Sequence, residues 1–563
     1  MPERLAQGRS MAEASTADSR QTGILGWVER TGNKLPDPVF IFFYLIIALV
    51  VISVIASMTG VSALHPTAVD EQTGGALLIE AISLLSPENI QRLWVEMPAT
   101  FTHFHPLGYV LVVMLGAGVA ERSGFFAAGM SKAVKAAPTS LLTPVVALVA
   151  MLGNHAADAG YVVLIPLAGI LFAAAGRHPL AGIAAAFAGV SGGFSANISP
   201  GQLDALLFGI TEEAVGASAL DPAWTANIAG NWYFISAMTL LFLPIIWYVT
   251  DKVIEPRLGP WKGGATAGVD AGGTSPDPAE HDDALASKGL RHAGLAALFV
   301  IGVWLLMVFA PGTPLIDEAA CLAENGSAVP DCSIHTQLAP LYRSLVAGFF
   351  LLFLLTGWAY GRATGTIKDH RDLVNMMAES MKDMGYYLVL AFAAAHFVAM
   401  FGWSNLGLIT AVHGAAGIES TGLPLPLVLG LMVLFTGLLN LFVGSASAKW
   451  ALLAPILVPM LMLLGISPEG ATAAYRVGDS ATNIITPLMV YFPLILVFAQ
   501  RWQKEFGLGS LTAMMIPYSI WLLVSGTLLI VAWFYLGLPL GPDAPVSYAL
   551  PEVVAPAAGL PEG

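Results

Sequence analysis

Two apolar stretches limit what this chain can fold into. Residues 139–174 and 427–464 are each too long for one membrane-crossing helix and too short for two, because one crossing takes about 20 apolar residues. Small and polar residues interrupt each stretch, at Gly153–Gly160 and at Gly444–Trp450. Irregular backbone at membrane depth is tolerated only where it lines protein or a watery cavity. We therefore expect each stretch to form a re-entrant hairpin that turns inside the membrane.

The other apolar stretches are long enough to cross a bilayer once. They are residues 37–58, 106–128, 180–212, 228–250, 289–311, 341–362, 383–412, 468–500 and 511–537. Only 11% of the residues are charged, against about 25% in soluble domains. The sequence thus predicts an all-α polytopic membrane protein with about nine transmembrane helices plus two opposed re-entrant hairpins. The lipid bilayer is an expected partner, and nucleic acid is not.

The distribution of Lys and Arg predicts the orientation in the membrane. The loops 213–227, 312–340 and 413–426 and the tail 538–563 contain neither residue type. Cytoplasmic loops are enriched in both. We therefore expect a cytoplasmic N-terminus, an external C-terminus, a first hairpin that opens to the cytoplasm and a second that opens outward.

The same layout divides the chain into five parts. Residues 1–36 form a polar cytoplasmic tail without a cleavable signal peptide, and residues 538–563 form an external tail. Residues 37–250 form a first membrane half with hairpin 139–174 and broken helix 180–212, and residues 289–537 form a second half with hairpin 427–464 and broken helix 468–500. A cytoplasmic linker, residues 251–288, connects them and contains the Gly- and Asp-rich segment 263–283.

The two halves resemble each other along the chain. Placing the first hairpin on the second aligns Asp158 with Ser447 and Pro166 with Pro455. The expected hairpins have opposite orientations, so the repeat is inverted. Inverted repeats with interrupted helices are typical of secondary transporters.

Each predicted span that follows a hairpin is interrupted by polar residues, at Gly192–Pro200 and Gly478–Pro487. Proline removes a backbone hydrogen bond, and the freed carbonyls suit Na⁺. We expect both hairpin tips and both interruptions to meet in one binding site. The polar residues there either bind an ion or cap the broken helices: Asn154, Ser195, Asn197, Ser445, Ser447, Thr482 and Asn483.

Three ionisable residues stand out within these segments: Asp158, Arg476 and Asp479. Charged side chains at membrane depth are costly and usually functional. The guanidinium of Arg476 suits a carboxylate, which favours an anionic substrate. The structural alternative is that Arg476 and Asp479, one helical turn apart, neutralise each other. We expect Lys449 to extend to the outer surface.

Other kinds of chemistry find less support. An intramembrane aspartyl protease needs two carboxylates that share a proton, and Arg476 beside Asp479 argues against it, so we expect no enzyme. His155 and Asp158 lack a third ligand for a transition metal. We expect no cofactor and no metal beyond Na⁺. Cys321 and Cys332 share one loop and form a disulfide if that loop lies in an oxidising compartment.

Several motifs together resemble the p-aminobenzoyl-glutamate transporter (AbgT) family, over about residues 24–541. They are Gly26–Pro38, Gly116–Gly124, Asn154–Gly169, Gly192–Pro200, Asn231–Phe234, Asp251–Gly259, Phe401–Gly407 and Tyr475–Pro493. The resemblance implies a homodimer in the bacterial inner membrane, with nine transmembrane helices and two opposed hairpins in each chain. It also implies symport or antiport of p-aminobenzoyl-glutamate, a folate catabolite, driven by a Na⁺ or H⁺ gradient. Some members export sulfonamide antimetabolites, which gives antibiotic resistance.

The resemblance assigns substrate-binding roles to Asp158, Trp450, Pro468, Arg476 and Asp479. We expect the Trp450 indole to stack on the aminobenzoyl ring while Arg476 holds a glutamate carboxylate. A Na⁺-coupled dicarboxylate carrier of the same architecture stays open, and it would need no aromatic platform.

Overall fold

The computed structural model describes residues 36–69, 75–156, 160–221, 224–262, 283–310, 312–322, 334–486 and 488–551. Within this part of the chain the fold is almost entirely helical. Eight helices are long and apolar enough to cross a membrane, or up to ten spans when two sharply bent helix pairs are included. The predicted class, an all-α polytopic membrane protein with hairpins, is confirmed.

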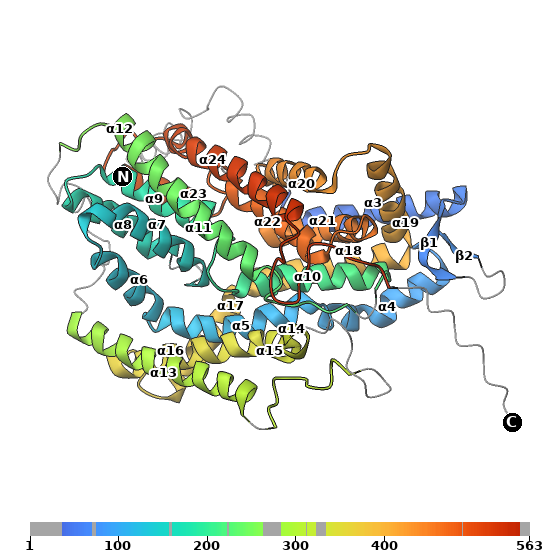
Figure 1. Cartoon of the computed structure of the whole chain (residues 1–563), viewed down its shortest axis with the longest axis horizontal. Coiled ribbons are helices and arrows are strands. Elements are labelled where there is room, and N and C mark those ends of the chain that lie inside the picture. Colours follow the sequence, from blue (N-terminus) through green and yellow to red (C-terminus); the bar gives the residue numbers. More distant parts are fainter. Residues whose placement is uncertain are drawn as a thin grey trace, which may run out of the picture.

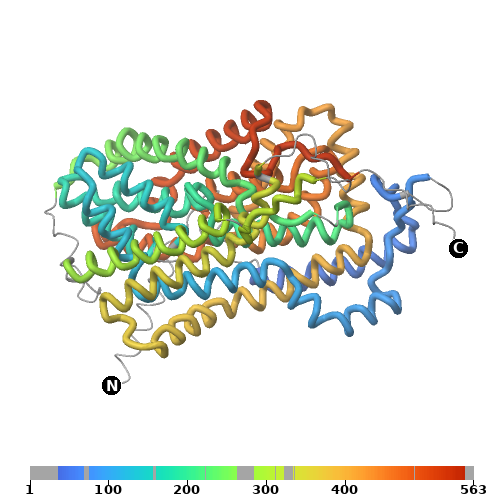
Figure 2. Tube along the Cα trace, turned by 60° about the horizontal axis from the view of Figure 1, so that its bottom comes forward, coloured from blue at the N-terminus to red at the C-terminus, as the bar shows by residue number. Residues whose placement is uncertain are grey.

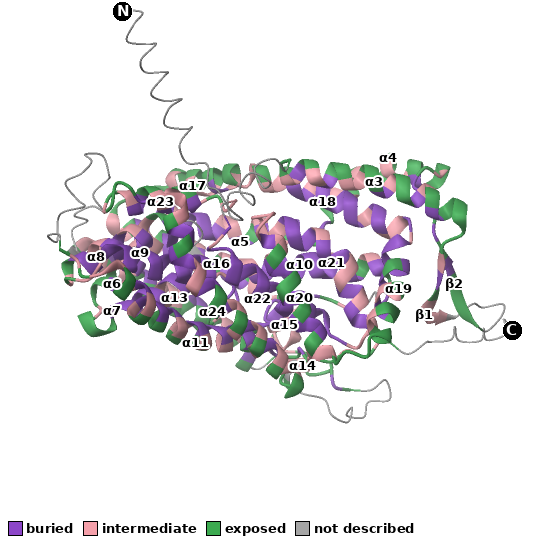
Figure 3. Cartoon of the chain, turned by 90° about the horizontal axis from the view of Figure 1, so that it is seen from above, coloured by how far each residue is buried: buried purple, intermediate pink, exposed green. Residues whose placement is uncertain are grey.

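The long helices run along the long axis of the molecule (Figure 1). They are α3 (Pro38–Thr59), α5 (His105–Arg122), α11 (Trp232–Tyr248), α13 (Asp283–Phe309), α16 (Leu345–Thr364), α18 (Gly385–Trp403) and α24 (Leu508–Tyr535). Buried residues gather in the middle and exposed ones lie on the outer faces (Figure 3). Those outer faces are apolar, as Phe40 on α3 and Phe299 on α13 illustrate. An apolar exterior is what a lipid environment requires.

The first hairpin consists of α7 (Leu142–Leu152), η2 (Gly153–Ala156), η3 (Gly160–Leu164) and α8 (Ile165–Ala174). Helix α6 (Phe125–Lys135) and the short η1 (Thr139–Leu141) precede it, and the chain bends by 114° between α6 and the first arm. Asp158, predicted at the tip, lies outside the described residues.

The second hairpin consists of α20 (Leu425–Asn440) and α21 (Ala446–Leu463), and α19 (Leu406–Ser420) precedes it with a bend of 117°. Ser445 caps α21 by accepting a hydrogen bond from the Ala448 N–H. The two hairpins lie toward opposite ends of the long axis (Figure 1), which agrees with their predicted opposite orientations.

Both predicted helix interruptions are present. Helix α9 (Pro179–Phe187) continues into η4 (Ala188–Gly192), and irregular backbone then leads to α10 (Gln202–Ser218). In the second half, α22 (Pro468–Thr482) is separated from α23 (Phe492–Gln500). The two halves pack against each other where α10 of the first half contacts both α21 and α22 of the second.

The predicted span 383–412 is not one helix. Helix α18 ends at Trp403, and α19 starts at Leu406 after Asn405, whose φ of 60° lies in the left-handed region. Asparagine tolerates this conformation better than most residues, so the sequence permits a turn inside an otherwise apolar run. The predicted span 106–128 likewise breaks where α5 ends at Arg122.

Several elements outside the predicted spans complete the fold. Strands β1 (Ser62–Val69) and β2 (Ala76–Glu80) pair antiparallel, and with α4 (Pro87–Thr102) they lie at one end of the molecule (Figure 2). The remaining elements are η5 (Val249–Ile254), α12 (Glu255–Leu258), α14 (Ile334–Gln337), α15 (Ala339–Arg343) and α17 (His370–Asp383).

Helices α5 and α16 approach each other closely because glycines lie at their contact. A β-carbon on Gly357 of α16 would come within 2.6 Å of the Ala120 backbone, and one on Gly116 of α5 would come within 2.3 Å of the Phe350 carbonyl oxygen. Small residues at helix crossings are a common packing device in membranes.

We predict that Gly357→Ala lowers stability, by about 1–3 kcal/mol, because the backbone of α5 would have to move away. The measurement is thermal unfolding of the detergent-solubilised protein. Gly302→Ala on α13 is the matched control, since nothing lies within 4 Å of its added β-carbon. Equal melting temperatures for both variants would contradict this account of the packing.

Candidate functional site

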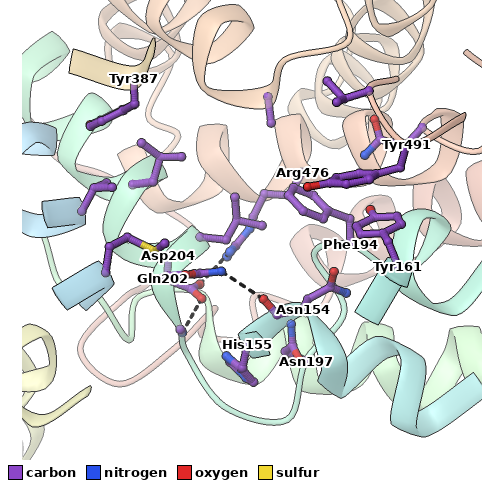
Figure 4. A pocket seen from close by; sticks show the side chains of 18 of the residues that line it. Asn154, His155, Tyr161, Phe194, Asn197, Gln202, Asp204, Tyr387, Arg476 and Tyr491 are labelled. Atoms are coloured by element: carbon purple, nitrogen blue, oxygen red, sulfur yellow. Dashed lines mark hydrogen bonds and ion pairs between the residues drawn. The ribbon is translucent and has the colours of Figure 1, made fainter. Parts of the chain in front are cut away.

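A cavity of about 380 Å³ lies where the two hairpins and the two broken helices meet (Figure 4). The first half contributes residues of the first hairpin, the irregular segment after η4, and the start of α10. The second half contributes the tip of the second hairpin, α22, and the segment before α23. The polar and aromatic residues that line it are Asn154, His155, Tyr161, Phe194, Asn197, Gln202, Asp204, Tyr387, Arg476, Asn483 and Tyr491.

An ion pair between Arg476 and Asp204 forms one wall of the cavity. The Nη2 of Arg476 on α22 donates to Oδ1 of Asp204 on α10 over 2.6 Å, and the Arg476 side chain is only 1% exposed. The other carboxylate oxygen of Asp204 accepts the Gly201 N–H over 2.8 Å, at the N-terminus of α10. Both oxygens of Asp204 are therefore engaged, and the pair connects the two halves of the protein.

Several buried polar atoms of the cavity find no hydrogen-bond partner among the described residues. They are Nε and Nη1 of Arg476, Oδ1 of Asn197 and Oε1 of Gln202. Buried polar groups in folded proteins are nearly always hydrogen-bonded. A guanidinium that lines a cavity and has unsatisfied nitrogens is suited to bind a carboxylate.

Three helices begin at the cavity. Gln202 starts α10, Ala446 starts α21, and Tyr491 directly precedes α23. The N-terminus of a helix carries a partial positive charge and unpaired N–H groups, which favour anions. The helix termini and Arg476 therefore make the cavity suitable for negatively charged groups.

The cavity also has an aromatic wall. The rings of Tyr161 and Tyr491 stack in parallel, with centroids 4.2 Å apart and an interplanar angle of 11°. Figure 4 shows Phe194 close to this pair. Tyr161 comes from the first hairpin and Tyr491 from the second broken helix, so the wall also joins the two halves.

Trp450 does not line the cavity. Its side chain is fully buried, its Nε1 donates to the Thr211 hydroxyl over 3.0 Å, and its ring stacks on Tyr475 with centroids 4.5 Å apart. One face of the indole is therefore already covered. The predicted stacking of Trp450 on a substrate ring would require Tyr475 to move.

Asp479 belongs to a second buried ion pair, beside the cavity. It pairs with Lys449 of α21, and both side chains are 2% exposed. The expectation that Lys449 extends to the outer surface is wrong, because the side chain points inward to this carboxylate. The alternative that Arg476 and Asp479 neutralise each other is also wrong, since each pairs with a residue on another helix.

The other predicted polar residues mostly hold the irregular backbone in place. Asn154 donates to the Met151 carbonyl, Thr482 donates to the Gly478 carbonyl, and Ser195 N–H donates to the Ser480 hydroxyl. Ser447 contacts Ser445 at the start of α21. These contacts are those of helix caps and backbone supports.

Pro468 opens α22 at a distance from the cavity lining. It is buried at the first turn of that helix, where proline is favoured.

Asp158 and Cys332 lie outside the described residues. Cys321 is buried and disulfide-bonded.

Sequence reasoning missed Asp204, Asn440, Tyr161 and Tyr491. Asp204 lies inside the predicted span 180–212, so the rule that singled out Asp479 would have found it as well. Tyr161 and Tyr491 carry no such signal, because their pairing depends on how the halves pack.

Among the described residues, no group of three or more His, Cys, Asp and Glu side chains could hold a metal ion.

Comparison with known proteins agrees with this architecture. Residues 23–548 match the AbgT transporter family. The chain is 37% identical to the p-aminobenzoyl-glutamate transport protein of Escherichia coli, with 94% of this chain and 99% of that protein covered.

Two solved structures are also similar. The YdaH transporter of Alcanivorax borkumensis is 40% identical with a TM-score of 0.79, and 90% of this chain and 100% of that one are covered. MtrF of Neisseria gonorrhoeae is described as illuminating a class of antimetabolite efflux pumps. It is 40% identical with a TM-score of 0.81, and 93% of this chain and 100% of that one are covered. The relatives are named as transporters, not enzymes, and the chain belongs to the AbgT transporter family.

Proposed function

We propose that this protein is an ion-gradient-driven secondary transporter of p-aminobenzoyl-glutamate in the bacterial inner membrane. The observation that carries the proposal is the Arg476 guanidinium, which belongs to the lining of the cavity between the hairpins and has two nitrogens without a hydrogen-bond partner among the described residues. The substrate named for the Escherichia coli relative supports it, since that molecule combines carboxylates with an aromatic ring.

The chemistry of the cavity matches each part of this substrate. Nη1 of Arg476 donates to one glutamate carboxylate while Nη2 holds Asp204, and the N-termini of α10 and α21 face the second carboxylate. The aminobenzoyl ring packs against Tyr161 and Tyr491. A cavity of about 380 Å³ is within the range that holds a small organic ligand.

Charge balance explains why such a substrate requires a coupling cation. Arg476 with Asp204, and Lys449 with Asp479, each sum to zero charge. A substrate with two carboxylates would leave two uncompensated negative charges inside the membrane, which is costly. Na⁺ or H⁺ that binds together with the substrate reduces this cost and links transport to a gradient, whereas an ion that moves against the substrate links transport to a gradient without offsetting the charge.

The alternatives fit the cavity less well. A dicarboxylate carrier makes use of Arg476 but not of the aromatic wall formed by Tyr161 and Tyr491. Efflux of sulfonamide antimetabolites, compatible with that wall, is a second candidate because MtrF is described with antimetabolite efflux pumps. A protease finds no support, since Asp204 and Asp479 each pair with a cation.

We also propose a homodimer with a cytoplasmic N-terminus and an external C-terminus. The orientation follows from the distribution of Lys and Arg in the loops. The dimer follows from the resemblance alone. Transport then proceeds by alternating access, in which the hairpin-bearing core moves relative to the rest of the dimer.

Proteoliposomes test the substrate directly. We expect proteoliposomes that contain the purified protein to take up labelled p-aminobenzoyl-glutamate when a Na⁺ or a proton gradient is imposed. Excess unlabelled substrate should abolish the uptake of label. Liposomes without protein are the control. Uptake of a simple dicarboxylate in preference to p-aminobenzoyl-glutamate would show that the proposed substrate is wrong.

We predict that Arg476→Lys weakens p-aminobenzoyl-glutamate binding about ten-fold or more, because an ammonium lacks the planar guanidinium in which one nitrogen holds Asp204 while another donates to the substrate carboxylate. Binding to the solubilised protein is measured by titration. Arg343→Lys, at an exposed arginine that contacts Thr225, is the matched control. Unchanged affinity in Arg476→Lys would contradict the assigned role.

The aromatic wall gives a separate prediction about specificity. Tyr491→Leu should weaken binding of p-aminobenzoyl-glutamate about 2- to 10-fold, because a ring contact is lost, while Tyr491→Phe retains it. Affinity for glutamate alone should be the same in both variants. An equal loss in the two variants would assign the effect to the hydroxyl instead of the ring.

A further inference from the structure

The Lys449–Asp479 pair lies where three helices meet: α20 and α22 contribute oxygen atoms, and α21 contributes the ammonium. The Nζ of Lys449 on α21 donates to Oδ1 of Asp479 on α22 and to Oδ1 of Asn440 on α20. All three side chains are buried, with Asn440 fully so. A carboxylate oxygen and an amide oxygen therefore converge on one point, and an ammonium occupies that point.

The amide group of Asn440 fixes its own oxygen toward this point. Its Nδ2 donates to the Asp479 carbonyl over 2.7 Å, to the Thr482 hydroxyl over 2.9 Å and to Oδ1 of Asn483 over 2.8 Å. These contacts leave Oδ1 of Asn440 facing Lys449. Carboxylate and amide oxygens are hard ligands, and transporters of this kind bind Na⁺ with such groups beside broken helices.

The position is connected to the substrate cavity. Asn483 lines the cavity and accepts the hydrogen bond from Asn440. Asp479 lies one turn after Arg476 on α22. A cation at this point therefore neutralises Asp479 directly beside the residues that face the substrate.

Other charged groups on the helices around α21 are engaged elsewhere. On α10, Asp204 pairs with Arg476 and Glu212 accepts from Tyr109. On α18, His396 contacts the Phe392 carbonyl. On α22, the uncharged Tyr475 hydroxyl donates to the Ala446 carbonyl and also interacts with the Asp479 carboxylate. Lys449 is thus the cation that the described structure supplies to Asp479.

We propose that the Lys449 ammonium is a resident cation that takes the place of an alkali cation between Asp479 and Asn440. Wild-type protein then needs no Na⁺ at this point, and removal of the ammonium creates a Na⁺ site. An uncompensated buried carboxylate is strongly unfavourable, so the vacated point attracts a small cation from solution. This inference rests on the proposed function and narrows the choice of coupling ion, because Na⁺ cannot bind where Lys449 lies.

The experiment compares the melting temperatures of the solubilised proteins in NaCl and in N-methyl-D-glucamine chloride at equal ionic strength and pH. We expect wild type and Lys382→Ala, an exposed control on α17, to respond equally to Na⁺, with no Na⁺ bound at Asp479 in either. Lys449→Ala should be stabilised by Na⁺, by about 2 °C or more. The double variant Lys449→Ala, Asp479→Ala should lose that response.

A Na⁺-specific shift in the wild type that is lost in Asp479→Ala would overturn the inference, and so would a Lys449→Ala protein whose response to Na⁺ equals that of the wild type. If Lys449→Ala does not fold in either salt, Lys449→Gln in the same comparison decides, with Na⁺ stabilisation expected and its absence contradicting the proposal. Uptake of p-aminobenzoyl-glutamate by the wild type is measured in parallel. Failure of that uptake would refute the proposed substrate, while the melting temperatures would still decide the role of Lys449.

Discussion

The ion pair between Arg476 and Asp204 connects the two halves of this protein. Asp204 lies in the first turn of α10 in the first half, Arg476 lies on α22 in the second, and both are buried where a lone charge would be strongly unfavourable. The second carboxylate oxygen of Asp204 accepts a hydrogen bond from the Gly201 N–H at the N-terminus of α10. This one ion pair therefore links three features. They are the start of α10, the position of Arg476, and the contact between the halves.

The broken helices and hairpins give the membrane interior a polar cavity at low cost. Asn154, Ser445 and Thr482 satisfy backbone groups that the interruptions expose. Helix N-termini and a partly unpaired guanidinium then face the same cavity. An anion that enters it meets positive potential, but the two ion pairs leave no net charge to balance the anion. We propose that a coupled cation supplies this balance.

Much of this architecture was predictable from the sequence because membrane constraints are strong. Apolar length gave the spans, and polar interruptions at Gly153–Gly160 and Gly444–Trp450 gave the hairpins. The turn at Asn405 and the β1–β2 hairpin carry no such signal. At the site, Arg476 and Asp479 were recognised as buried charges, but their partners, Asp204 and Lys449, depend on helix packing that a single sequence does not reveal. The Tyr161–Tyr491 stack was missed for the same reason.

The most direct test of the account is an experimental structure of the protein with p-aminobenzoyl-glutamate bound. The account predicts a glutamate carboxylate on Nη1 of Arg476, with the aminobenzoyl ring against Tyr161 and Tyr491 and the Arg476–Asp204 pair retained. A substrate bound away from this cavity, or bound inside it without contact to Arg476, would contradict the central claim.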